Sequence, residues 1–143
     1  MTYKDESPTG TEIVKGGVYT AELVGIDKMT TAMKDSVHFD SYLWRWRIIG
    51  GKHDGRYSRG LTPRRMVRSR KGSNISRLVE WLDVLKGEAI KPEVVSKYSK
   101  IDVGVEVLRE KYVGQVCKIR ITRHKHSTGG VDYRVTSIVE VVV

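Results

Sequence analysis

The chain of 143 residues is 39% hydrophobic and carries a formal net charge of +9. Its length and composition predict one folded domain with its own core, and they exclude a disordered or low-complexity chain. The single cysteine, Cys117, excludes an intramolecular disulfide, and no apolar run is long enough to form a transmembrane helix. We therefore expect a cytoplasmic protein that binds no membrane and needs no cofactor.

All of the excess positive charge lies in one stretch, residues 45–71. This stretch holds ten Lys or Arg residues and one acid, Asp54, whereas the rest of the chain holds sixteen residues of each sign. Eight of the ten are arginine, whose planar group suits bidentate phosphate contacts and base stacking better than lysine does. A merely solvated surface would mix the two signs, so the stretch predicts a surface that binds a polyanion.

The first predicted strand spans residues 18–26. Tyr19, Ala21 and Leu23 alternate along it and should face one side of a sheet. The polar segment 28–40 that follows is expected to be a loop or an irregular strand end.

Residues 42–49 form the clearest strand pattern in the chain. One face carries aromatic and aliphatic side chains, namely Tyr42, Trp44, Trp46 and Ile48. The other face carries Arg45 and Arg47, and burying two unpaired arginines in a small core would be very unfavourable. We therefore expect the tryptophan face to point inward and the two arginines to point outward.

Residues 50–55 predict a hairpin connection, because three of the six are glycine. The next strand is expected over 56–62, with a β-bulge at Gly60 that lets the strand bend. A basic loop follows over residues 63–72.

Ser73 is the predicted N-cap of a helix that ends near Lys86. Its buried stripe has helical spacing and consists of Ile75, Leu78, Val79, Leu82 and Leu85. Trp81 lies at the edge of this stripe, where packing is its expected role. Pro92 can start a short second helix, and residues 103–112 predict one or two further helical turns.

Two last strands are predicted over 116–126 and 132–143. Three strands, a helical insertion and two more strands is the element order of a five-stranded OB-fold barrel, a mainly β fold. We expect this single domain over residues 13–143, after a flexible leader over residues 1–12. An open α+β sheet with helices on one face is the alternative.

The runs GVYTAEL, LWRWRIIGG and DGRY, together with the predicted helix and YVGQVCKIRI, resemble phage-encoded single-strand DNA-binding proteins of the OB type. The resemblance covers about residues 16–143. It implies a barrel that coats or guards single strands during phage DNA replication or recombination, in the cytoplasm of the host.

The OB fold binds its ligand largely on its second and third strands. In this chain those two predicted strands and the loop after them carry the excess arginines, so most of the candidate binding residues are arginines. They are Arg45, Arg47, Arg56, Arg59, Arg64, Arg65, Arg68, Arg70 and Lys71, with Tyr57 as the preferred aromatic platform for a base. Phe39 and Tyr133 are weaker aromatic candidates. A second basic cluster, Lys118, Arg120, Arg123 and Lys125, either extends the binding groove or only solvates its strand.

Neither a metal site nor catalysis is expected. His124 and His126 share one face of their strand, but with Cys117 they supply fewer than the four ligands of structural zinc. The acids are scattered among lysines, as on solvated surfaces, and do not form the carboxylate cluster of a nuclease. The sequence contains no phosphate-binding loop, nucleophile elbow or deaminase signature.

The expected function is single-stranded DNA binding with little sequence preference, in phage or plasmid DNA replication or recombination, driven by counterion release and base stacking. One alternative is a basic adaptor or regulatory protein that docks an acidic protein partner. Another is a binder of double-stranded DNA or RNA that uses the same arginines. RNA is also possible as the single-stranded ligand, because the 2′-OH contacts that distinguish RNA from DNA leave no sequence signature. The sequence is also compatible with a homo-oligomer.

Overall fold

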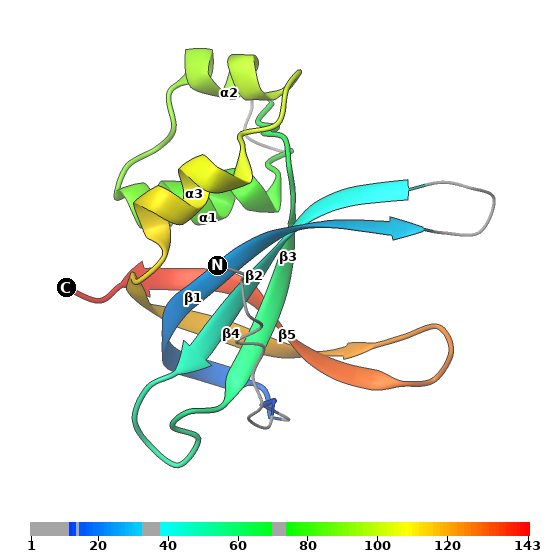
Figure 1. The fold of residues 1–143 in the computed structure, drawn as a ribbon, viewed down its shortest axis with the longest axis vertical. Coiled ribbons are helices and arrows are strands. Elements are labelled where there is room, and N and C mark those ends of the chain that lie inside the picture. Colours follow the sequence, from blue (N-terminus) through cyan, green and yellow to red (C-terminus); the bar gives the residue numbers. More distant parts are fainter. Residues whose placement is uncertain (1–11, 14, 33–37, 70–73) are drawn as a thin grey trace.

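A computed structural model describes residues 12–13, 15–32, 38–69 and 74–143. Within these residues the protein is mainly β, with one five-stranded antiparallel sheet and three helices (Figure 1). The strands are β1 (Gly17–Ala32), β2 (His38–Ile48), β3 (Tyr57–Pro63), β4 (Val116–Lys125) and β5 (Val131–Val141). The helices are α1 (Arg77–Lys86), α2 (Pro92–Tyr98) and α3 (Val105–Tyr112), and all three lie between β3 and β4.

The sheet order is β3-β2-β1-β4-β5, so the predicted sequence of three strands, a helical insertion and two strands is confirmed. β3 and β5 are the two edges of the open sheet. The predicted leader lies almost wholly outside the described residues, which begin at Glu12. None of the helices described here has the length and apolar character needed to cross a membrane.

The two sheet edges approach each other closely at Gly60. A Cβ at this position would lie 2.6 Å from the carbonyl oxygen of Val135 in β5 and 2.7 Å from Cη2 of Trp81. The predicted bulge at Gly60 is wrong, since the β2–β3 register runs without a shift from Ser41 to Arg47. Glycine is required here because there is no room for a side chain.

The first two strands extend beyond their predicted ends. The polar segment predicted as a loop or an irregular strand end pairs as regular strands in its described residues, up to the partners Ala32 and His38, because backbone hydrogen bonds need no apolar side chains. We call this extension the β1–β2 arm (28–32 and 38–42) and the matching hairpin the β4–β5 arm (122–126 and 131–134). Figure 1 shows both arms projecting from the same side of the sheet.

The tryptophan face of β2 is buried, as predicted. Trp44 and Trp46 are fully buried, and Trp81 of α1 packs edge-on against both, with ring centroids 5.2 and 6.4 Å away. Trp44 Nε1 donates a hydrogen bond to Thr62 Oγ1 at 2.9 Å, which satisfies both groups inside the core. Packing is therefore the role of Trp81, and α1 covers one end of the sheet.

Helix α1 begins later than its sequence pattern predicts. Its N-cap is Ser76, whose hydroxyl accepts a hydrogen bond from the backbone N–H of Val79, and its C-cap Gly87 adopts a left-handed conformation. The predicted cap, Ser73, lies outside the described residues. Ile75 does not belong to the buried stripe: it is exposed and forms a β-bridge with Arg68.

Candidate nucleic-acid interface

Four of the predicted binding residues lie together on the outer side of β2 and β3. Arg45 is directly opposite Arg59 in the strand register, and Arg47 is opposite Tyr57. These positions alternate with the buried tryptophans, so they point away from the core. We call Arg45, Arg47, Tyr57 and Arg59 the arginine face.

Each arginine of this face is paired with a carboxylate that is distant in sequence. Arg47 Nη2 lies 2.6 Å from Glu22 Oε1, and Arg45 Nη2 lies 2.9 Å from Asp27 Oδ2. Arg59 Nε lies 3.9 Å from Glu12 Oε1. The excess charge of residues 45–71 is therefore partly neutralised at this surface, by partners that the sequence alone does not indicate.

Arg45 is the least accessible of the three arginines. Its side chain is 13% exposed, and its partner Asp27 also accepts a hydrogen bond from Arg109 Nη2 of α3 at 3.0 Å. Burial, and secondarily the nearby Arg109 charge, lower the pKa of Arg45 from its ordinary value. Arg45 thus helps to join β2, β1 and α3, whereas Arg47 and Arg59, 45% and 54% exposed, are accessible to a ligand.

The described arginines of the basic loop, Arg64, Arg65 and Arg68, mainly contact other parts of the fold. Arg64 donates to the carbonyl oxygens of Ser41 and Met29, each at 3.2 Å, and so clamps both strands of the β1–β2 arm. Arg65 Nε lies 3.3 Å from Asp102 Oδ1.

Arg68 donates hydrogen bonds to the Asp83 carboxylate of α1 and to the carbonyl oxygen of Ile90, which ties the basic loop to the helical insertion. Arg70 and Lys71 lie outside the described residues. Arg56 is half-buried at the end of the hairpin loop, apart from the outward positions of β3.

A small hollow lies beside the arginine face. It has a volume of about 130 Å³, and its lining consists of Met29, Leu43, Arg59, Gly60, Leu61 and Arg134. The lining comes from β1, β2, β3 and β5, and Arg59 belongs to both the hollow and the arginine face. Apolar side chains next to two guanidinium groups can hold the face of a base and a neighbouring phosphate.

Among the residues of the hollow, only Arg59 was predicted from the sequence to bind a ligand. Leu43 and Leu61 could have been found, because they alternate with the outward arginines on their own strands. Arg134 was missed because β3 and β5 come together only in the folded sheet.

The second basic cluster is less neutralised by ion pairs than the arginine face is. Lys118 pairs with Glu140 at 3.1 Å, but Arg120, Arg123 and Lys125 are exposed and form no ion pair with any residue that the structure describes. Arg123 lies opposite Tyr133 on the β4–β5 arm. The cluster thus adds accessible positive charge to β4, the one strand that contributes no residue to the lining of the hollow. For Phe39, the structure describes the backbone only.

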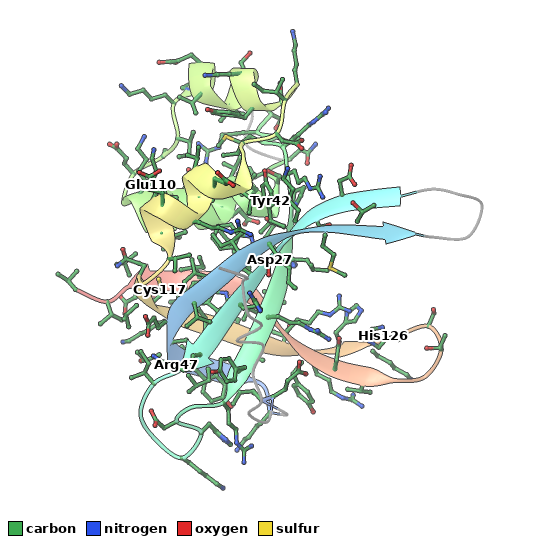
Figure 2. The ribbon with its side chains drawn as sticks, in the orientation of Figure 1. Asp27, Tyr42, Arg47, Glu110, Cys117 and His126 are labelled. Atoms are coloured by element: carbon green, nitrogen blue, oxygen red, sulfur yellow. The ribbon has the colours of Figure 1, made fainter. Side chains whose placement is uncertain are left out.

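Asp132 lies on the β4–β5 arm opposite His124, and Figure 2 labels its neighbour His126 on the same arm. It accepts a hydrogen bond from Arg134 Nε at 2.9 Å and lies 3.4 Å from His126 Nε2. Burial acts to raise the pKa of Asp132, but the Arg134 hydrogen bond and the charges of Arg134 and both histidines lower it overall. The ion pair with Arg134 therefore persists well below neutral pH.

The one cysteine, Cys117, is buried in the core, away from the arginine face and the hollow. Burial raises the pKa of Cys117 to about 11, so the thiol stays protonated and inert at neutral pH. Across the described ranges, no three His, Cys, Asp or Glu residues come together in a way that could hold a metal ion.

No family model, curated protein or solved structure matches the chain.

Proposed function

We propose that this protein binds single-stranded DNA with little sequence preference and catalyses no reaction. The proposal rests on the position of Arg59. This residue belongs to the arginine face of β2 and β3 and also lines the apolar hollow between the two β arms. Phosphates bind the guanidinium groups, and unpaired bases contact the hollow and Tyr57.

The apolar lining of the hollow favours a single strand as ligand. In a duplex the bases are stacked and paired, so their faces are unavailable to Met29, Leu43 and Leu61. Pairing of Arg47 and Arg59 with carboxylates weakens the attraction for a bare array of phosphates. A ligand that offers both phosphates and free base faces gains from both parts of the surface.

We propose further that the sheet is an OB-type barrel. The OB fold is a five-stranded, partly open barrel that binds oligonucleotides on its second and third strands, between the connections of strands 1–2 and 4–5. The close approach of β3 and β5 at Gly60 and the two arms beside the hollow support this assignment. With the resemblance to phage proteins, it suggests a role in phage DNA replication or recombination.

Mapping by NMR tests the location of the site. Adding a short oligothymidylate to ¹⁵N-labelled protein should shift the amide signals of residues 43–47, 57–61 and 132–134, because they surround the hollow and the arginine face. Shifts confined to α2 and residues 64–69 would contradict the proposed site. An unchanged spectrum at low salt would contradict single-strand binding altogether and favour an acidic protein partner.

A further inference from the structure

The three carboxylates on the arginine face are held to different degrees. Asp27 forms ion pairs with both Arg45 and Arg109, and Arg45 is nearly buried. The Asp27 carboxylate is therefore held in place by the fold. Glu22 and Glu12 each pair with one arginine, and their side chains are 29% and 52% exposed. Glu22 is about as accessible as Asp27, but unlike Asp27 neither Glu22 nor Glu12 has a second arginine partner among the described residues, so another anion can replace them.

Glu12 is positioned by the backbone beside it. The backbone N–H of Ile13 donates to the carbonyl oxygen of Tyr57 at 2.9 Å, and the Ile13 side chain is almost fully buried. Glu12 itself forms a parallel β-bridge with Tyr57. The chain therefore holds an exposed carboxylate next to Arg59, at the point where the arginine face meets the hollow.

Glu22 is held in a comparable way by the sheet. It lies directly opposite Arg47 in the β1–β2 register, and Arg47 lies opposite Tyr57 on the other side. Cross-strand neighbours of this kind are within reach of each other without any change in the backbone. The carboxylates of Glu22 and Glu12 thus occupy the two accessible guanidinium groups that a nucleic-acid backbone would use.

We propose that Glu12 and Glu22 compete internally with nucleic-acid phosphates for Arg47 and Arg59, and thereby set the selectivity of the site. This inference rests on the proposed function. An exposed ion pair changes an equilibrium by no more than about fivefold, so a strand held at several points can displace both carboxylates. A polyanion that offers phosphates alone gains less from the exchange, because it leaves the hollow empty.

The test compares wild-type protein with Glu12→Gln, Glu22→Gln and the double variant, in fluorescence titrations with matched single-stranded and duplex oligonucleotides. Each substitution should tighten single-strand binding by about twofold to fivefold. Each should also steepen the slope of log affinity against log salt by up to about 0.7, because no carboxylate is released to offset the phosphate contact. Duplex binding, which gains nothing from the hollow, should tighten by a larger factor than single-strand binding, so the preference for single strands should fall. Equal tightening of both would show that the carboxylates do not set the selectivity.

The matched control is Glu88→Gln, which removes the same charge from an exposed pair with Lys86 beyond the end of α1. It should leave both the affinity and the salt slope nearly unchanged. Weaker binding by the glutamine variants would show that the carboxylates orient the arginines, and unchanged binding would show that they do not compete; either result overturns the inference. Wild-type protein that fails to bind single strands would instead overturn the proposed function.

Discussion

Replacing Arg47 and Arg59 together with alanine should weaken single-strand binding by about tenfold to a hundredfold, since in the proposed complex each would form a charge-assisted contact with a phosphate. The slope of log affinity against log salt should become shallower by up to about 1.4 units. Both side chains are about half exposed, so the free energy of unfolding should change by less than about 0.5 kcal/mol per substitution. Titrations at several salt concentrations, with urea unfolding, measure all three quantities.

The choice of this pair follows from the structure. Arg45 is the more obvious partner of Arg47 in sequence, but it links β2 to Asp27 and α3, so its removal would also disturb the fold. Lys97→Ala with Lys100→Ala removes two exposed positive charges at the end of α2 and serves as the control. If this control weakens binding as much as the arginine pair does, general charge is responsible and the arginine face is not the site.

Trp46→Ala should have the largest effect on stability. Trp46 is fully buried against Trp81, and truncating a buried tryptophan costs about 3–5 kcal/mol, through lost burial and the cavity that remains. Domains are stable by only about 5–15 kcal/mol, so the variant should unfold at a much lower urea concentration or fail to fold. Circular dichroism during urea unfolding measures the change without relying on tryptophan fluorescence.

The exposed neighbour Ile49 supplies the control for the tryptophan variant. Ile49→Ala shortens an exposed side chain just beyond the end of the same strand and should alter stability by less than about 0.5 kcal/mol. A Trp46→Ala protein of normal stability that no longer binds DNA would be decisive against our account. Trp46 would then be a stacking platform, and the assignment of the two faces of β2 would be reversed.

The local parts of the fold could be predicted from sequence. Alternation along β2 is enough to place Trp44 and Trp46 inside and Arg47 outside, because a strand has two faces and burying unpaired arginines is unfavourable. The start of α2 at Pro92 was predicted in the same local way, since proline is suited to the first turn of a helix.

The electrostatics of the candidate site could not be predicted in this way. In β1 the register shifts between Leu23 and Gly25, so that Ile26 lies opposite Trp44 on the core side and Asp27 faces outward toward Arg45. Strict alternation from Leu23 would have placed Asp27 inside. The isolated Gly25 is the available sequence signal, because a glycine within a strand pattern often marks a bulge.

The basic loop shows the same limitation. Its charge pattern predicted ligand contacts for Arg64, Arg65 and Arg68, but each meets a partner supplied by a distant segment, such as Asp102 or Asp83. Those partners are between about 15 and 38 residues away in sequence, so no local pattern could reveal them. The charge of a segment therefore predicts the charge of a surface only when the neighbours in the fold are known.

The most direct test of the central claim is a fluorescence titration of the wild-type protein with single-stranded and duplex oligonucleotides of equal length, at about 50 and 200 mM salt. We predict tighter binding to the single strand at both concentrations, and an affinity whose logarithm falls with log salt by about 0.7 for each phosphate contacted. Equal or tighter binding to the duplex would contradict a site built for unpaired bases. Absence of binding at the lower salt concentration would contradict nucleic-acid binding itself.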